Sequence, residues 1–539
     1  MKALIRFTLG LLGAMTLAGC GEAVQHDKIR QSGFVFCGQS VPTTFNPQLV
    51  DSGVTVEAIS PQIFDTLLVL EPITHKPIAN IAKRWSTNDD RTEYLFELRD
   101  DVSFQTTAWF APSRKLNAHD VVFSFERIIN SYHPYHYSGG GVYPWFSSIN
   151  FSNLLKSVEA IDAHTVKFTL ARPDNAFLSN IATAFSPIHS AEYADSLIIK
   201  DEKQRLDTHP VGTGPFYLDE YQVNDLIRLK RHDHYWNGVA KVKQVIFDVS
   251  VRGTGTLAKL LRQECDVLSS PISSQLPVIK EQDDLVLNTK PAMNVAFISI
   301  NTQHPALGDA RVRKALSLAI NRKNILDSVY YGTGTQAHTL LPPSSWAYLP
   351  DTVQVRYDRN YALGLLREAG YDQGLRLSMS VPLEPKAYNP SPRKTAELVQ
   401  SNFADIGVKL DLVTEERLNR TDTERNNRFD LVLAGWVGDT GDPDNFLRPL
   451  LSCDAKPSGL NLSSWCNPDF DFLIDLALEV NKPRYRTNLY NQVQNLLNEE
   501  VPVIPIAHGM HSQAHHHSLE GFKMSPFNVQ PLNDVERID

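Results

Sequence analysis

Hydrophobic and polar residues follow two different periods along this chain. Alternation at every second position, or a short unbroken apolar run, predicts strands at residues 33–38, 94–98, 165–170, 245–251, 297–300, 408–413 and 501–507. Apolar residues at spacings of three and four predict helices at residues 121–130, 257–264, 311–330, 394–406 and 484–499. Because helices and strands alternate along the chain, the pattern predicts an α/β fold.

Two of these helices have recognisable boundaries. Asn117 followed by Asp120 matches a capping box at the start of helix 121–130, in which each side chain bonds the backbone of the other residue. Gly407 predicts the end of helix 394–406, because glycine adopts the left-handed conformation that closes many helices. No internal repeat and no linker rich in Gly or Ser divides the chain, which fits a chain that crosses between domains more than once.

The N-terminus has the pattern of an export signal. Lys2 and Arg6 precede an apolar run at residues 9–17, and the Leu-Ala-Gly sequence before Cys20 resembles the bacterial lipobox. The apolar region is shorter than the roughly 20 residues that span a bilayer. The resemblance implies that residues 1–19 are a signal peptide and that the Cys20 thiol carries a lipid anchor. Ordinary signal cleavage without lipidation is the alternative.

The length and charge bound the class of protein. A chain of 539 residues has room for about three domains of ~150 residues. Its 52 Lys and Arg and 61 Asp and Glu give a net charge of -9, which becomes -11 when the two cations of the leader are removed. Without a basic block, such a chain is a poor candidate for binding nucleic acid. The negative charge favours cationic ligands at long range, or it only keeps the protein soluble.

Four cysteines remain besides Cys20. An even number in an exported protein suggests two disulfides. Cys453 and Cys466 flank a polar loop, so we expect them to pair, which leaves Cys37 for Cys265. Four free buried thiols and a metal site are the alternatives, although no C-x-x-C spacing supports zinc.

Motifs that would indicate an enzyme are missing or incomplete. The chain has no G-x-S-x-G, H-E-x-x-H or G-x-x-x-x-G-K-[ST] motif, which speaks against a secreted hydrolase and against a nucleotide-dependent enzyme. Residues 253–258 match G-x-G-x-x-[GA], but Ser273 stands where a dinucleotide site would have an acid. We interpret these residues as a plain strand-to-helix turn and expect no cofactor.

Histidines gather near the C-terminus and around a Tyr-rich loop. The first group is His511, His515, His516 and His517, and the second is His133 and His136. Such groups can bind metal, but the side chains of adjacent residues in a strand point to opposite faces. A solvated loop is therefore the favoured interpretation of the C-terminal group, and we expect no metal site.

A series of short stretches resembles the solute-binding proteins of peptide ABC transporters, the dipeptide and oligopeptide group known as family 5. In order, they are FNP at 45–47, AKRW at 82–85, YLFELR at 94–99, LNAHDVVFSF at 116–125, PVGTGPF at 210–216, VRKAL at 312–316, AIN at 319–321, EAG at 368–370, GWVGD at 435–439 and DPD at 442–444. Residues 30–37, 254–261, 340–342 and 345–348 are most similar to the Sap-type members, which are linked to cationic antimicrobial peptides.

This resemblance implies a periplasmic binding protein type II fold. In that fold two hinged lobes close on a ligand, and a third domain is inserted near the N-terminus. Projected onto this chain, lobe I covers residues 33–63, 213–291 and 510–539, the inserted domain covers residues 64–212, and lobe II covers residues 292–509. The two disulfides of the family match Cys37–Cys265 and Cys453–Cys466.

The resemblance also implies a peptide-binding site. Asp439 occupies the position that takes the peptide's N-terminal ammonium, a charge-assisted bond, with Gly435 and Trp436 beside it. Trp436 would form an apolar wall, although core packing is an equal alternative. For Asp439 the alternative is a loop acid that caps a turn.

At the other end of the peptide the chain departs from the family pattern. Dipeptide binders place an arginine for the peptide carboxylate before Tyr-Asn-Pro, and here Lys386 precedes Tyr388. A lysine cannot make the planar two-point bond of an arginine. The departure puts strict selection of dipeptides in doubt and leaves room for longer peptides. The alternative for Lys386 is a solvated surface lysine.

Together, these features predict a monomeric, non-catalytic lipoprotein of the periplasm. It would capture peptides, including cationic antimicrobial peptides, in a cleft between its lobes and deliver them to a permease and an ATPase of the inner membrane. Haem or another non-peptide solute in the same cleft is one alternative. A sensor lipoprotein that does not transport is another, and a secreted hydrolase is disfavoured.

Overall fold

The computed structural model describes residues 29–38, 41–251, 253–349, 356–415, 428–457, 459–527 and 529–538. The expected signal peptide and Cys20 lie outside these residues. Within the described chain, no helix combines the length and the apolar character that crossing a membrane requires.

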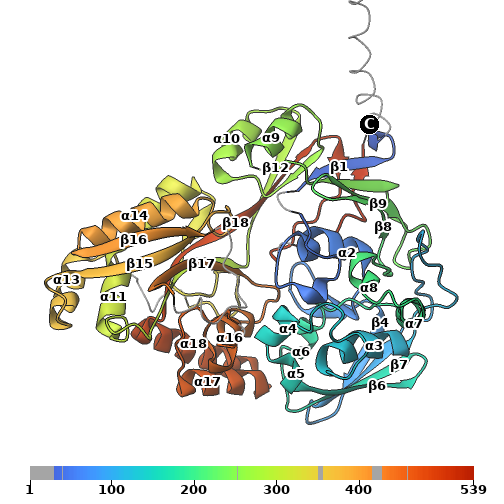
Figure 1. The fold of residues 1–539 in the computed structure, drawn as a ribbon, viewed down its shortest axis with the longest axis horizontal. Coiled ribbons are helices and arrows are strands. Elements are labelled where there is room, and N and C mark those ends of the chain that lie inside the picture. Colours follow the sequence, from blue (N-terminus) through green and yellow to red (C-terminus); the bar gives the residue numbers. More distant parts are fainter. Residues whose placement is uncertain are drawn as a thin grey trace, which may run out of the picture.

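One long strand connects the two halves of the largest sheet. This strand, β18 (Val503–His516), pairs in its first half with β13 (Asn294–Ile300). In its second half it pairs with β11 (Val267–Ser269) and β12 (Leu285–Pro291). Figure 1 shows it as a red diagonal from the left part of the molecule toward the upper right. The two halves therefore share a strand and do not follow one another as separate sheets.

The large sheet has twelve strands in the described chain, ten of them in the order β16-β15-β17-β13-β18-β11-β1-β10-β9-β8. Its other strands are β1 (Gly33–Cys37), β8 (Phe216–Gln222), β9 (Leu226–Arg231), β10 (Gln244–Asp248), β14 (Gly334–Gln336), β15 (Leu375–Pro382), β16 (Val408–Glu415) and β17 (Leu431–Val437). The smaller sheets contain β2 (Leu68–Leu70), β3 (Pro77–Ala79), β4 (Ala82–Thr87), β5 (Glu93–Leu98), β6 (Leu155–Asp162), β7 (Thr165–Leu170), β19 (Leu519–Glu520) and β20 (Glu536–Arg537).

The helices cover the faces of these sheets. In the first half of the chain they are α2 (Ser60–Ile63), α3 (Ala118–Ile129), α4 (Pro144–Ser148), α5 (Phe151–Leu154), α6 (Phe177–Asn180), α7 (Ala191–Ile199), α8 (Arg205–Thr208) and α9 (Thr254–Leu261). In the second half they are α10 (Leu276–Lys280), α11 (Ala310–Ala319), α12 (Arg322–Ile325), α13 (Arg359–Glu368), α14 (Pro392–Ala404), α16 (Asp444–Leu451), α17 (Pro468–Glu479) and α18 (Pro483–Glu500).

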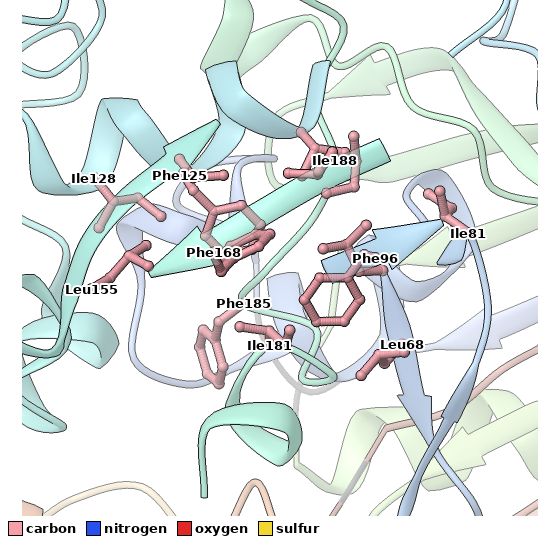
Figure 2. Packing of buried hydrophobic residues seen from close by; sticks show 14 of the residues in the cluster. Leu68, Ile81, Phe96, Phe125, Ile128, Leu155, Phe168, Ile181, Phe185 and Ile188 are labelled. Atoms are coloured by element: carbon pink, nitrogen blue, oxygen red, sulfur yellow. The ribbon is translucent and has the colours of Figure 1, made fainter. Parts of the chain in front are cut away.

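The segment between β2 and α8 has a hydrophobic core of its own. Its antiparallel sheet β4-β5-β7-β6 is covered by α3. The rings of Phe96 and Phe125 contact Phe168 edge-on at centroid distances of 5.3 and 5.0 Å. Figure 2 shows these rings meeting between the strands, with Phe185 at the lower margin of the cluster. Edge-to-face pairs add to the stabilisation that buried aromatic area provides.

Several predicted boundaries are confirmed. The capping box is present, because the Asn117 side chain accepts a hydrogen bond from the N-terminal backbone of α3 and Asp120 accepts one from Asn117. Gly407 follows α14 with a positive φ of 77°. β7 has the predicted bounds. These features could be predicted because each depends on neighbours in the sequence.

The predicted helix 311–330 is wrong as a single element. α11 ends at Ala319, because Ile320 adopts an extended conformation and Asn321 starts a new turn by capping α12. The backbone N–H of Asn321 donates to the side chain of Asn402, so a tertiary contact holds the break. The hydrophobic stripe continues across this break, which hides it from a periodicity argument.

Of the C-terminal histidines, only His517 lies in an exposed turn, so the interpretation as a solvated loop is wrong for the other three. His511, His515 and His516 lie in β18 and are buried, each between 2% and 5% exposed. The predicted strand 501–507 extends to His516, because this part of β18 pairs with β12 along its whole length. Within the described residues, no group of three His, Cys, Asp or Glu side chains gathers as metal ligands would.

The residues at 253–258 lead directly into a helix. α9 begins at Thr254, three residues earlier than predicted, directly after Gly253. Gly253 has a φ of 64°, which explains the glycine at this position.

Two disulfides tie distant parts of the chain together. Cys37 at the end of β1 bonds Cys265 just before β11, across 228 positions. Cys453 bonds Cys466 across 13 positions and closes the loop between α16 and α17. The first disulfide joins β1 to the residues just before β11, the strand that pairs with β1, so it fixes the centre of one half of the large sheet.

Candidate ligand-binding site

A cavity of about 490 Å³ lies where several parts of the chain meet. Its walls come from residues 51–80, from residues 182–185, from β17 with the turn that follows it, and from the C-terminal loop 523–534. Small-molecule sites typically have volumes of roughly 300–1,000 Å³ and lie at such junctions. The cavity is therefore the leading candidate for a binding site.

All four residues expected from the sequence to contact a ligand line this cavity. Gly435 and Trp436 belong to β17, Asp439 follows that strand by two residues, and Lys386 lies on a turn that crosses it. β17 lies in the middle of its half of the sheet, between β15 and β13. Its carboxyl end therefore presents the Asp439 loop from a rigid base.

Asp439 is held by two side chains from different parts of the fold. Its Oδ2 accepts a hydrogen bond of 2.9 Å from Nε1 of Trp145, which belongs to α4. Its backbone N–H donates to Oδ1 of Asn445, at the start of α16, over 2.8 Å. The carboxylate is half-buried, and no Lys, Arg or His among the described residues lies within ion-pair distance of it.

The environment of Asp439 favours its protonated form. Burial raises the pKa of Asp439 to about 7, although the hydrogen bond from Trp145 lowers it. The negative charges of Asp51 and Glu57, which line the same cavity, raise this pKa further. A cation placed against Asp439 would remove this penalty, so the site favours a positively charged group.

Asp442, three residues later, has a different role. Its carboxylate accepts hydrogen bonds from Arg486 at 2.7 Å and from the hydroxyl of Tyr490 at 3.1 Å. It also caps the backbone of Asp444. The structural acid of this loop is therefore Asp442, and the acid that faces the cavity is Asp439.

Trp436 combines the two roles considered for it. Its side chain is only 5% exposed and packs in the cluster that includes Phe446. It also contributes to the cavity wall. Among the described residues, its indole N–H has no hydrogen-bond partner.

Two glycines allow the turn that carries Lys386 to lie directly on the sheet. A Cβ atom on Gly435 would meet the ring of Tyr388 at 2.2 Å, and one on Gly509 would meet the carbonyl oxygen of Ala387 at 2.0 Å. The turn closes on itself through two backbone hydrogen bonds between Lys386 and Asn389. The position of Gly435 in the site is thus explained by close packing.

Lys386 lies at the rim of the cavity. Its side chain is about half exposed, and Nζ lies 3.6 Å from a carboxylate oxygen of Glu384. An exposed ion pair of this kind contributes roughly 0–1 kcal/mol. The lysine is therefore able to leave its present partner at little cost.

Asp65 is a second buried acid that lines the cavity, but its carboxylate already accepts three hydrogen bonds from side chains. Asp65 accepts hydrogen bonds from Thr213, Tyr235 and Trp236 at 2.9 to 3.0 Å. Burial raises the pKa of Asp65, and these hydrogen bonds oppose the rise. Asp65 therefore supports the wall formed by Tyr235.

Sequence reasoning missed Trp145, Asp51 and Glu57. Trp145 lies 294 positions from Asp439, and nothing local indicates their contact. The one available signal is the run of aromatic residues at 143–146, which is unusual for an exposed loop. Asp51 and Glu57 belong to a short stretch of mixed polar and apolar residues, in which nothing local indicates a contact with Asp439.

The chain is similar to known proteins along most of its length. The family model described as "Bacterial extracellular solute-binding proteins, family 5 Middle" matches residues 76–458. The chain is 42% identical to the peptide transport periplasmic protein SapA of Salmonella typhimurium, over 98% of this chain and 96% of that protein. It is 34% identical to heme-binding protein A of Haemophilus influenzae, over 98% of this chain and 99% of that protein.

A solved structure is also similar along the whole fold. It is the dipeptide binding protein from Pseudoalteromonas in complex with Met-Leu, with a TM-score of 0.88 and 38% sequence identity. The match covers 94% of this chain and all of that protein.

Proposed function

The chain belongs to the bacterial extracellular solute-binding proteins of family 5, and from this premise we propose that it captures peptides in the cavity beside Asp439. Its fold is the α/β type II fold of periplasmic binding proteins, as predicted from the sequence. In the proposed role the protein has no catalytic function and delivers bound peptide to a separate permease and ATPase.

The observation that carries this proposal is the half-buried carboxylate of Asp439. It faces the cavity, and the described chain offers it no cation. A free N-terminal ammonium would supply the missing charge through a charge-assisted hydrogen bond. The acidic side chains of Asp51 and Glu57 support a preference for peptides that carry further positive charge.

Lys386 is proposed to meet the other end of the peptide. It lies on the same cavity as Asp439, and an ammonium can pair with a carboxylate without the fixed geometry of an arginine. This freedom supports binding of peptides of more than one length. Gly435 and Trp436 would form the wall between these two ends.

We also propose the three-part division of the chain. The core around Phe96 and Phe168 supports an inserted domain at residues 64–212. Separate clusters around Ile298 and around Phe247 support the two lobes. The location is proposed to be the periplasm, with a lipid on Cys20 as the anchor after removal of residues 1–19, and the protein is proposed to be a monomer.

A thermal-shift screen tests this function. Pools of two- to eight-residue peptides with free N-termini should stabilise the protein, by about 2.7 kcal/mol at one hundred times the dissociation constant. Mass spectrometry of the recovered peptides should find them intact. Stabilisation by haem alone would favour a haem-binding role like that named for the Haemophilus relative, and cleaved peptides would contradict a non-catalytic protein.

A further inference from the structure

The Asp439 carboxylate receives a side-chain hydrogen bond from a distant part of the molecule. Trp145 belongs to α4 in the segment 64–212, whereas Asp439 follows β17 in the segment 292–509. The indole N–H donates to Oδ2 over 2.9 Å. The side chain of Asn445, on the same part of the chain as Asp439, is a second neighbour that lowers the pKa of this carboxylate.

The direction of the indole is fixed by its surroundings. Trp145 is 1% exposed and stacks on Phe185 with a centroid distance of 4.9 Å and 9° between the ring planes. Phe146 contacts the indole edge-on at 5.1 Å. Phe185 also lines the cavity. Because the indole cannot rotate freely, its N–H points in one direction, and forming the hydrogen bond costs little conformational entropy.

Other contacts join the same two parts of the chain away from the cavity. The side-chain N–H₂ of Asn175 donates to the carbonyl oxygens of Leu478 and Val480 at 2.6 and 2.8 Å. Arg91 donates to Asn175 and to the carbonyl oxygen of Glu479. In Figure 1 this is the region where α4–α6 face α16 and α17. These contacts hold the two parts together without touching Asp439.

We propose that Trp145 is a positioning residue for the ligand's ammonium: its N–H orients the Asp439 carboxylate only when segment 64–212 is docked on segment 292–509. The inference rests on the proposed function. A bond that exists in one arrangement of the two parts couples ligand affinity to that arrangement. Asp51 and Glu57 face the same carboxylate, and no described cation lies within ion-pair distance, so Trp145 is its principal stabilising partner.

A pair of variants separates positioning from simple docking. Trp145→Phe removes the N–H and keeps an aromatic ring for stacking, whereas Asn175→Ala removes docking bonds outside the cavity. Calorimetry would use the tripeptide Lys-Ala-Ala and its Nα-acetylated form between pH 5.5 and 8. Trp145→Phe should weaken binding of the free peptide roughly tenfold or more, the range for hydrogen bonds to charged groups, and leave the acetylated peptide unchanged.

The pH profile provides a second readout. Loss of the indole N–H should move the acidic midpoint of free-peptide binding upward, because the bond favours the ionised carboxylate. Asn175→Ala lowers the fraction of docked molecules but keeps the indole N–H in each of them, so it should weaken both peptides by the same factor and leave the midpoint in place. Equal losses for both peptides with Trp145→Phe, or an unmoved midpoint, would overturn the positioning role.

Two further outcomes keep the inference distinct from the function it rests on. If the unaltered protein binds both peptides equally, the assignment of Asp439 fails, whatever the variants do. If Trp145→Phe does not fold, NMR of the unaltered protein provides the test instead, through the indole ¹H–¹⁵N resonance of Trp145. That resonance should shift with the ionisation of Asp439 and on addition of Lys-Ala-Ala, and a resonance insensitive to both would overturn the proposal.

Discussion

At the scale of single residues, the site depends on two acids of one loop that have opposite roles. Asp442 is paired with Arg486 and stabilises the loop, while Asp439 faces the cavity, and no cation of the described residues pairs with it. Both are aspartates of a short polar stretch, so their roles follow from what surrounds them. The unpaired one is the one available to a ligand.

The first residue-scale prediction concerns pH. The pKa of Asp439 near 7 means that the ligand-free carboxylate gains a proton as the pH falls below 7. An ammonium binds the ionised form, so the affinity for Lys-Ala-Ala should fall up to tenfold per pH unit between pH 7 and 5.5. Calorimetry measures this directly, and the Nα-acetylated peptide is the control. A flat profile for the free peptide would speak against an ionised Asp439 as its partner.

The second residue-scale prediction concerns the stability of the ligand-free protein. Because the folded-state pKa of Asp439 lies above the unfolded value near 4, the folded state binds the extra proton, and stability falls as the pH rises from 4 through 7. Asp439→Asn should therefore stabilise the ligand-free protein at pH 7.5 by ~1–3 kcal/mol, allowing for partial solvent exposure. Urea unfolding measures it.

Asp442→Asn is the matched control for that experiment. It removes a partner of buried Arg486 and should destabilise the protein by about 3–5 kcal/mol. Destabilisation of similar size by both variants would show that Asp439 is a structural acid as well.

At the scale of elements, local signals were sufficient for some features and not for others. The capping box at Asn117 and the stop at Gly407 involve neighbours in the sequence, and both are present. The break after Ala319 is held by Asn402, and the length of β18 is set by its pairing with β12. Neither partner is visible from the local pattern. The resemblance to a family placed Asp439 at the cavity, but the contact with Trp145 arises only from the fold.

Close packing of the Lys386 turn on β18 can be tested with two glycines. Gly509→Ala would force a Cβ against the carbonyl oxygen of Ala387 and should cost about 1–3 kcal/mol, with weaker peptide binding. Gly364→Ala, in α13 with open space around it, should instead stabilise by about 0.5–1 kcal/mol. Chemical unfolding compares the two, and equal effects would contradict the packing account.

At the scale of the whole molecule, β18 holds the two halves of the large sheet together, because it pairs with strands of both. The central strand of the large sheet belongs to both halves, and the division into about three domains stays a prediction. The return crossing near residue 510 lies inside β18, so no linker marks it in the composition of the chain.

The two disulfides should differ in what their removal costs. Cross-linking a longer loop removes more entropy from the unfolded chain, so loss of Cys37–Cys265, across 228 positions, should cost about 5 kcal/mol. Loss of Cys453–Cys466, across 13 positions, should cost about 3 kcal/mol. Urea unfolding of Cys-to-Ser pairs measures both, and the reverse order would contradict this argument.

The central claim, that Asp439 binds the free N-terminus of a peptide, is tested most directly by one calorimetric comparison. The unaltered protein and Asp439→Asn would be titrated at pH 7.5 with Lys-Ala-Ala and with its Nα-acetylated form. The account predicts that acetylation costs the unaltered protein roughly 2–5 kcal/mol of binding free energy and that Asp439→Asn binds both peptides equally weakly. Equal affinity of the two proteins for the free peptide would contradict it.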